Sequence, residues 1–330
     1  MAPQAAFLLL IGLGSAPDAI PRDLPARFEA DLVYLQPGDG TRRLRLYTDT
    51  GGGLFLKQDA VERLGLPSEP GDAGLVAELG EGASYTRLPD FVHASGIPDP
   101  AGTADGRLPV MPAAAAHNTP LPGTGEDDGM LGQAWFADRV WTWDYPGERL
   151  RLESPHWRPT ADMRRVALGF PTGDDGRRST SFPRIDVIVD GRTLPMLLDT
   201  GAMTVLTTAA LRTLDDGMPA QRATSMITDH LFQAWREAHP DWRVIESAQT
   251  GTGAAMIEVP EVEIAGWRVG PVWFTHRPDA NFHRFMSSMM DARVEGALGG
   301  NALRHFVMTV HYPEAAAWFD CITCRAQAPR

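Results

Sequence analysis

Two stretches of strand-like residues along the chain end in the same Asp-Thr-Gly triplet. Residues 44–48, Leu-Arg-Leu-Tyr-Thr, lead into the triplet at 49–51, and residues 194–198, Leu-Pro-Met-Leu-Leu, lead into the triplet at 199–201. A short apolar stretch follows each triplet. A tripeptide recurs by chance, but recurrence of the flanking pattern indicates two copies of one structural unit.

Strands are predicted ahead of both triplets. In the first copy, residues 28–35 alternate as one strand into a turn at 37–40. In the second copy, residues 185–189 meet a hairpin signal at 190–191, Asp-Gly. Each triplet is therefore expected at the end of the strand that returns from a turn.

Helical spacing follows each triplet. It covers residues 58–64 in the first copy and stops at Gly65. In the second copy it covers residues 207–214, where Thr207 or Thr208 is placed to cap the first turn.

The downstream halves of the two copies also match. An apolar-apolar-Gly sequence stands at 130–132 and again at 297–299. Each is followed by a short predicted helix and by a hairpin turned at Tyr-Pro, residues 145–146 and 312–313. Four elements that recur in the same order predict a mainly β protein of two tandem lobes.

The repeat sets the expected domain boundaries. The stretch from 154 to 180 is rich in Pro, Gly, Asp and Arg and is interpreted as the connection between the lobes. The predicted organisation is a signal peptide or buried first strand at 1–20, a first lobe at 21–155, a linker at 156–180, a second lobe at 181–320 and a tail at 321–330.

Two segments differ between the lobes. The second lobe carries a helical insertion, in which Ile227, Leu231, Phe232 and Trp235 are predicted to form one apolar, core-covering face. In the first lobe, residues 101–128 are dominated by Pro, Ala and Gly and are expected to form a long irregular loop.

Composition narrows the function classes. The 330 residues carry a formal net charge of -12 and no basic run, which argues against nucleic acid as the main partner. The apolar segment 5–13 is too short to span a bilayer and resembles a signal-peptide core. We expect a periplasmic or secreted protein, with a cytoplasmic one as the alternative.

Cysteine and histidine give little sign of a metal site. Cys321 and Cys324 form a C-x-x-C, and two thiols alone cannot complete a zinc site. We expect a small disulfide in an exported protein, or free thiols otherwise. A thioredoxin-like motif would open a helix, which is not expected where the chain trails into its C-terminus. His283 and His305 are interpreted as surface or packing residues.

Two carboxylates brought face to face supply acid and base in one site. Like charges at contact distance repel, so one carboxyl keeps a proton while the other is ionised. Such a pair can hold a water, deprotonate it towards a carbonyl and protonate the leaving nitrogen. Asp49 and Asp199 are the candidates for this pair.

The chain resembles the pepsin/retropepsin superfamily of aspartic peptidases, specifically its bacterial two-lobed, retropepsin-like members. The resemblance covers roughly residues 28–320 and rests on the paired triplets with their apolar-apolar-Gly partners; the sequence at 299–301, Gly-Gly-Asn, is similar to the retroviral Gly-Arg-Asn. It implies two tandem retropepsin-like β-barrel lobes related by a pseudo-twofold axis, and an aspartic endopeptidase. It implies no cofactor and no metal, a peptide or protein substrate, no membrane span and a monomer.

The resemblance also assigns residues. Asp49 and Asp199 would be catalytic, Thr50 and Thr200 would interlock, and the loop glycines, Gly51 and Gly201, would lie against the substrate. A flap is expected from about residues 80–91, with Tyr85 as the candidate flap tyrosine. Because fold does not settle activity, the alternative is a catalytically silent two-lobed protein that binds peptides.

This chain departs from the pepsin pattern after each triplet. Pepsins often place Ser or Thr there, whereas Gly52 and Ala202 carry no hydroxyl. The loss of a donor to the ionised carboxylate predicts an activity optimum less acidic than that of pepsin. The Gly52-Gly53 pair also predicts a looser loop around Asp49 than around Asp199.

Overall fold

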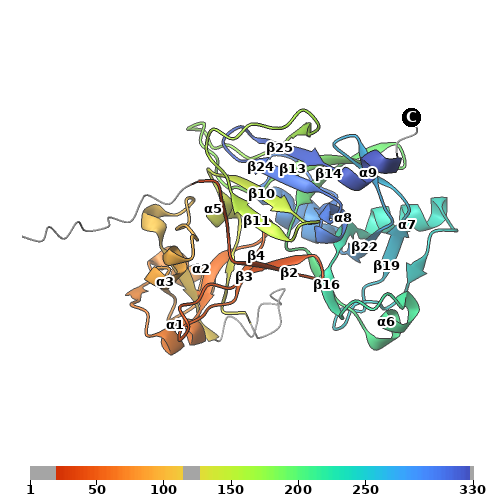
Figure 1. Ribbon diagram of the computed structural model, residues 1–330. Coiled ribbons are helices and arrows are strands. Elements are labelled where there is room, and N and C mark those ends of the chain that lie inside the picture. The colour runs from red at the N-terminus through yellow and green to blue at the C-terminus, as the bar shows by residue number, and fades with distance from the viewer. Residues whose placement is uncertain (1–19, 114–126, 328–330) are drawn as a thin grey trace, which may run out of the picture.

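The protein has two β-rich lobes joined by a central sheet, in a computed structural model that describes residues 20–113 and 127–327 (Figure 1). The expected signal peptide at 1–20 lies outside the described residues except for Ile20, since residues 1–19, 114–126 and 328–330 are not described. Within the described ranges, no helix has the length and apolar character needed to cross a bilayer.

The first lobe is built on a sheet with the strand order β2-β3-β4-β9-β5-β8-β7-β6. Its strands are β2 (Ala26–Glu29), β3 (Leu32–Leu35), β4 (Leu46–Thr48), β5 (Leu54–Lys57), β6 (Glu69–Pro70), β7 (Ser84–Thr86), β8 (Leu108–Met111) and β9 (Gly129–Leu131). Its helices are α1 (Gln58–Leu64), α2 (Ala73–Leu79), α3 (Asp90–Ala94), η1 (Ala104–Gly106) and α5 (Gln133–Phe136).

Two predictions in the first lobe are wrong. Residues 28–35 are not one strand, because β2 and β3 form a hairpin turned at Ala30 and Asp31, with φ of 50° and 67°. A two-residue turn with both φ positive usually contains Gly or Asn. Neither residue stands at 30 or 31, so no turn was predicted there. The predicted irregular loop contains η1 and β8, which pairs with β5 and β7 although it carries Pro109.

The second lobe repeats this plan with the strand order β18-β19-β22-β17-β23-β14-β13-β20-β21. Its strands are β13 (Arg184–Val189), β14 (Arg192–Leu198), β17 (Ser225–Thr228), β18 (Val244–Ile245), β19 (Met256–Val259), β20 (Val262–Ile264), β21 (Trp267–Val269), β22 (Val272–Arg277) and β23 (Gly296–Leu298). Its helices are α6 (Thr208–Leu214), α7 (Asp229–Ala238), η2 (Asn281–Phe285), η3 (Met286–Met289) and α8 (Gly300–Leu303).

Strand pairing shows which parts of the lobes are equivalent. In the first lobe, β9 pairs in parallel with β4 and antiparallel with β5; in the second, β23 pairs in the same way with β14 and β17. Because α7 follows β17 as α1 follows β5, α7 is the counterpart of α1. The insertion is instead the hairpin of β15 (Met203–Val205) and β16 (Gln221–Ala223) with α6 between them.

The predicted helix ends agree with the structure, and one helical assignment does not. Helix α1 ends at Gly65, which adopts the left-handed conformation, and the Thr207 hydroxyl accepts a hydrogen bond from Ala210 N at the start of α6. Leu231, Phe232 and Trp235 form the buried face of α7 as predicted, whereas Ile227 lies in β17.

Strands from both lobes form the central sheet, at the top of Figure 1. Its order is β1-β11-β10-β24-β25-β12. The strands are β1 (Arg22–Asp23), β10 (Val140–Asp144), β11 (Arg149–Leu152), β12 (Arg164–Ala167), β24 (Val307–His311) and β25 (Ala316–Asp320). The two Tyr-Pro hairpins meet where β10 pairs with β24, and the buried hydroxyls of Thr142 and Thr309 lie 2.8 Å apart there.

The predicted linker and tail segments both contain regular secondary structure. The segment 156–180 contributes β12, which pairs with β25. Cys321 follows β25, and α9 (Ile322–Gln327) begins directly after it, so this C-x-x-C does open a helix, contrary to expectation. Cys321 and Cys324 form a disulfide.

Candidate active site

Each Asp-Thr-Gly triplet lies in the loop that directly follows a central strand of its lobe, β4 or β14. A main-chain hydrogen bond joins each aspartate to the neighbouring strand. Asp49 N donates to Leu131 O at 3.1 Å, and Asp199 N donates to Leu298 O at 3.0 Å. The predicted apolar-apolar-Gly segments, β9 and β23, therefore support the two loops in the same way.

The two loops are tied to each other through their threonines. Thr200 N donates to Thr50 Oγ1 at 3.0 Å, and Thr50 N donates to Thr200 Oγ1 at 3.2 Å. The Thr50 hydroxyl also donates to Leu198 O at 2.6 Å. Both threonines are fully buried, so these hydrogen bonds form away from water and fix the relative position of the lobes at this point.

The loop glycines make room for the opposing carboxyl. A Cβ on Gly51 would lie 2.6 Å from Cγ of Asp199, and a Cβ on Gly201 would collide with the carboxyl of Asp49. Both glycines thus pack against the opposing carboxyl, and their expected contact with a substrate stays a prediction. Only glycine allows the two aspartates to approach each other across the lobe interface.

Burial changes the ionisation of both aspartates. Asp49 and Asp199 have exposed fractions of 4% and 8%. Burial raises the pKa of Asp199 well above its usual range, and the charge of Asp49 and the hydrogen bond between the two carboxyls raise it further. Burial also raises the pKa of Asp49, but the hydrogen bond from Asp199 and the amides of Gly51 and Gly201 oppose that rise. The two carboxyls therefore share a proton and titrate as a pair rather than as separate groups.

Each catalytic-loop aspartate accepts a hydrogen bond from the glycine amide two residues further on. Gly51 N donates to Asp49 Oδ1 at 2.7 Å, whereas the corresponding bond from Gly201 N to Asp199 Oδ1 is 3.1 Å. The expected looser loop around Asp49 stays a prediction, and close packing around Gly52 opposes it.

The packing around residue 52 differs from that at the equivalent place in the second lobe. A smaller residue at one position is matched by a larger one at the other. A Cβ on Gly52 would lie 2.6 Å from both Asp49 Oδ2 and the sulfur of Met130. At the equivalent positions the second lobe has Ala202 and, in place of the methionine, Ala297. Gly52 is therefore required by Met130, and a serine could not stand there without a shift of Asp49 or Met130.

A tyrosine that sequence reasoning missed crosses between the lobes at the site. The hydroxyl of Tyr47, in β4, donates to Gly201 O at 2.5 Å. The side chain is buried, and burial raises its pKa well above the usual value, so the hydroxyl stays a donor. Its counterpart in β14 is Leu197, and this difference two residues before each aspartate was the available signal.

The side chain of Tyr85, the candidate flap tyrosine, contacts Asp72 and Arg107. It is in β7, and three strands stand between β7 and β4 in the first-lobe sheet. Its hydroxyl donates to Asp72 at 3.2 Å, and the guanidinium of Arg107 lies 4.6 Å from its ring centre. Directly before the predicted flap region, Leu79, in α2, packs against the apolar cluster containing Tyr47.

Comparison with known proteins gives a likeness of fold alone. No family model matches the sequence, and no curated protein is similar to it. Three solved structures are similar over most of their length. EDGP is 11% identical over 95% of this chain and 98% of its own, with a TM-score of 0.45. Conglutin gamma, a basic 7S globulin from lupine seeds, is 10% identical over 90% of this chain and 94% of its own, with a TM-score of 0.43. Basic 7S globulin from soybean is 9% identical over 92% of this chain and 98% of its own, with a TM-score of 0.45. At these values the likeness carries no inference about activity.

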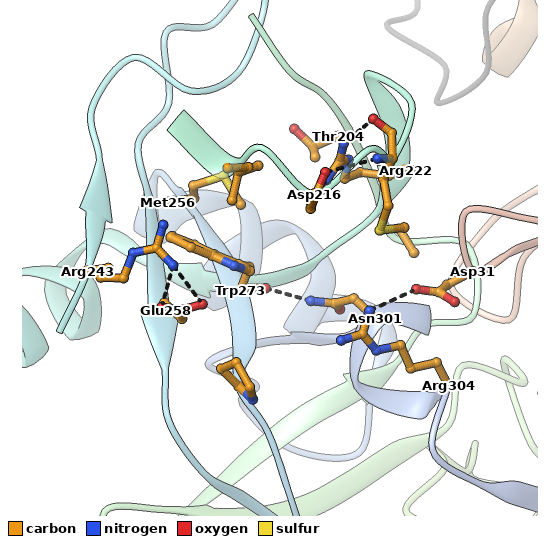
Figure 2. A pocket seen from close by; sticks show the side chains of 14 residues that line it. Asp31, Thr204, Asp216, Arg222, Arg243, Met256, Glu258, Trp273, Asn301 and Arg304 are labelled. Carbon is orange, nitrogen blue, oxygen red and sulfur yellow. Dashed lines mark hydrogen bonds and ion pairs between the residues drawn. The ribbon is translucent and has the colours of Figure 1, made fainter. Parts of the chain in front are cut away.

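A cavity of about 380 Å³ lies beside the inserted hairpin of the second lobe (Figure 2). Its charged side chains are paired with one another: Asp31 with Arg304, Asp216 with Arg222, and Glu258 with Arg243. Trp273, Met256 and Thr204 also line it. The buried Thr204 hydroxyl has no hydrogen-bond partner among the described residues. The cavity therefore offers an apolar wall and one free hydroxyl rather than a net charge.

Proposed function

We propose that the protein is an aspartic endopeptidase, which hydrolyses peptide bonds with a water activated between Asp49 and Asp199. The observation that supports this most is the pair of buried carboxyls, each packed against the loop glycine of the other lobe and both with raised pKa values. A pair of groups whose environments push their pKa values apart supplies the acid and the base of a hydrolytic step.

We assign the charged role to Asp49 and the protonated role to Asp199, the carboxyl whose pKa is raised well above its usual value. The charged Asp49 removes a proton from the water as its oxygen attacks the peptide carbonyl carbon, and Asp199 gives its proton to the carbonyl oxygen. The tetrahedral intermediate then collapses. Asp49 passes the proton to the leaving nitrogen, and Asp199 regains one from the intermediate, so the pair returns to its starting state.

The proposed enzyme works as a monomer. Both aspartates, both threonines and the strands that support them belong to one chain, so no second copy is needed to complete the pair. Its substrates are peptides or proteins. Structural disulfides persist in oxidising compartments, so the Cys321–Cys324 bond supports a periplasmic or secreted location.

The silent peptide-binding protein remains the competing hypothesis, because a scaffold can persist after its activity is lost. Retention of both carboxyls and both interlocking threonines favours activity. Cleavage of a denatured protein substrate by the parent protein and by the Asp49→Asn and Asp199→Asn variants separates the two. Asp186→Asn, a change at an exposed carboxylate of β13, is the matched control. We expect cleavage by the parent and the control only; cleavage by all four would refute the assignment.

A further inference from the structure

Three potential metal ligands converge in the second lobe, away from the aspartate pair. They are His230 at the start of α7, His283 in η2 and Glu295 directly before β23. One ligand atom from each lies within 4.8 Å of the others. His283 Nε2 is 2.8 Å from Glu295 Oε2, and His230 Nε2 is 3.9 Å from the same oxygen.

The contacts of His283 cannot all be satisfied by protein groups. Its Nε2 lies 2.8 Å from the Glu295 carboxylate and 3.0 Å from the guanidinium of Arg293. A single ring nitrogen either carries a proton and donates or has a lone pair and accepts. One of the two contacts is therefore unfavourable in either tautomer. A cation placed between His283 and Glu295 would accept both the lone pair and the carboxylate oxygen.

A second carboxylate lies beside His230. Its Nδ1 lies 3.6 Å from Asp279 Oδ1, and that oxygen also accepts a hydrogen bond from His230 N at 3.0 Å. The other ring nitrogen, Nε2, faces Glu295. Metal-bound histidines commonly direct the nitrogen that does not bind the metal to a carboxylate, which fixes the ring and its tautomer.

We propose that His230, His283 and Glu295 form a binding site for one Zn²⁺ ion. Zinc binds imidazole nitrogen at about 2.0–2.1 Å and carboxylate oxygen at about 2.0–2.2 Å, in tetrahedral geometry. This geometry places donor atoms roughly 3.3 Å apart. The separations of 2.8 and 3.9 Å bracket that value, so small side-chain movements suffice. His230 and Arg293 have exposed fractions of 45% and 60%, so water can reach the fourth position.

Arg293 is the group that competes with the metal. Its guanidinium is paired with Glu295 at 3.4 Å and occupies part of the space in front of His283. A pair involving such an exposed side chain contributes little to stability and is readily displaced. The Arg293→Ala variant should therefore bind Zn²⁺ more tightly than the parent protein, a result that a purely structural ion-pair cluster would not give.

The ion would tie three distant segments together behind the second catalytic loop. Residues 281–290 place Phe282, Met286 and Met290 in the apolar cluster that also contains Ala202 and Leu197. An ion held by α7, η2 and the residue before β23 would fix that cluster. Since a ligand that binds only the folded state stabilises it, Zn²⁺ should raise the unfolding temperature.

Titration calorimetry of the full chain with Zn²⁺ alone tests the proposal, with variants at each position. We expect one ion per chain. We expect affinity roughly 10–100-fold lower in Asp279→Asn, where only the orienting carboxylate is lost, and a larger loss in His283→Ala and Glu295→Gln. His239→Asn, at the opposite end of α7, is the control with unchanged affinity.

Two results would overturn the proposal. One is equal Zn²⁺ affinity in the parent, His283→Ala and Glu295→Gln proteins. The other is weaker binding by Arg293→Ala than by the parent. The Arg293 and Asp279 variants leave all three ligands in place, so they remain informative even if a ligand variant fails to fold. The peptidase assays do not depend on this outcome, so the two proposals fail separately.

Discussion

Thr50 and Thr200 exchange main-chain-to-hydroxyl hydrogen bonds of 3.0 and 3.2 Å across the interface between the lobes. These bonds lie directly beside the two aspartates in sequence, so the distance between the carboxyls depends on them. The pair is thus held by the same buried contacts that hold the lobes together.

Removal of the Thr50 hydroxyl should weaken both stability and the site. Thr50→Ala leaves Leu198 O and Thr200 N buried without their partner, at a cost of about 1–3 kcal/mol for each unsatisfied group. Thr50→Ser keeps the hydroxyl and is the control. Denaturant unfolding should show a marked loss for alanine and a small one for serine; equal losses would contradict the role given to the hydroxyl.

Substitution of the loop glycines should separate the carboxyls. Gly51→Ala places a methyl group 2.6 Å from Cγ of Asp199, and Gly52→Ala places one 2.6 Å from Asp49 Oδ2. Gly53 is the matched control, because a Cβ there meets nothing within 4 Å. Peptidase assays should show a large loss for the first two and near-parent activity for Gly53→Ala. Normal activity in Gly51→Ala would show that the close approach is not needed.

We expect the hydroxyl of Tyr47 to contribute to both stability and activity. Tyr47→Phe leaves the buried Gly201 O without this donor, at about 1–3 kcal/mol. Tyr145→Phe is the control, since the buried Tyr145 hydroxyl has no partner among the described residues. We expect lower unfolding free energy and lower activity for the Tyr47 variant, and an unchanged or slightly more stable Tyr145 variant. The reverse order would contradict the hydrogen bond.

The aspartate pair should lower the free energy of unfolding at neutral pH. The folded-state pKa of Asp199 is raised above 3.8, so the folded protein holds a proton that the unfolded chain releases. Stability from this proton is complete below about pH 3.8 and is lost as the pH rises through the folded pKa. Asp199→Asn keeps a donor towards Asp49 and does not ionise.

Unfolding temperatures measured against pH test this linkage. The Asp199→Asn variant should be more stable than the parent near neutrality, and the difference should shrink as the pH falls towards 3.8. A variant that is less stable than the parent at every pH would show that Asp199 is not protonated by its environment.

Sequence patterns predicted the doubled unit well because its signals are local. The strands before the triplets, the apolar-apolar-Gly segments and the Tyr-Pro hairpins each occupy a few consecutive residues. The turn at Ala30 and Asp31 was missed because Ala is unusual at positive φ and the pair is not one of the usual Asn-Gly or Asp-Gly turn signals. The strand β8 was not predicted because proline is unusual inside a strand. It forms nevertheless, because it pairs with β5 on one side and with β7 on the other.

The candidate site was predicted in its chemistry but not in its packing. The two aspartates and threonines follow from the repeated triplet. The contact of Gly52 with Met130, which lies 78 positions further on, and that of Tyr47 with Gly201 join residues far apart in the chain. The three proposed zinc ligands are likewise brought together only by the fold. Such contacts depend on how the lobes pack, which short-range patterns do not encode.

The most direct test of the central claim is digestion of a peptide library followed by mass spectrometry, from about pH 3 to about pH 8, with and without pepstatin. We predict cleavage that follows a bell-shaped pH profile, with its optimum less acidic than that of pepsin, and that pepstatin abolishes. The Asp199→Asn variant should leave the same peptides intact. Identical cleavage by that variant, or peptide binding with no cleavage by the parent protein at any pH, would contradict the account.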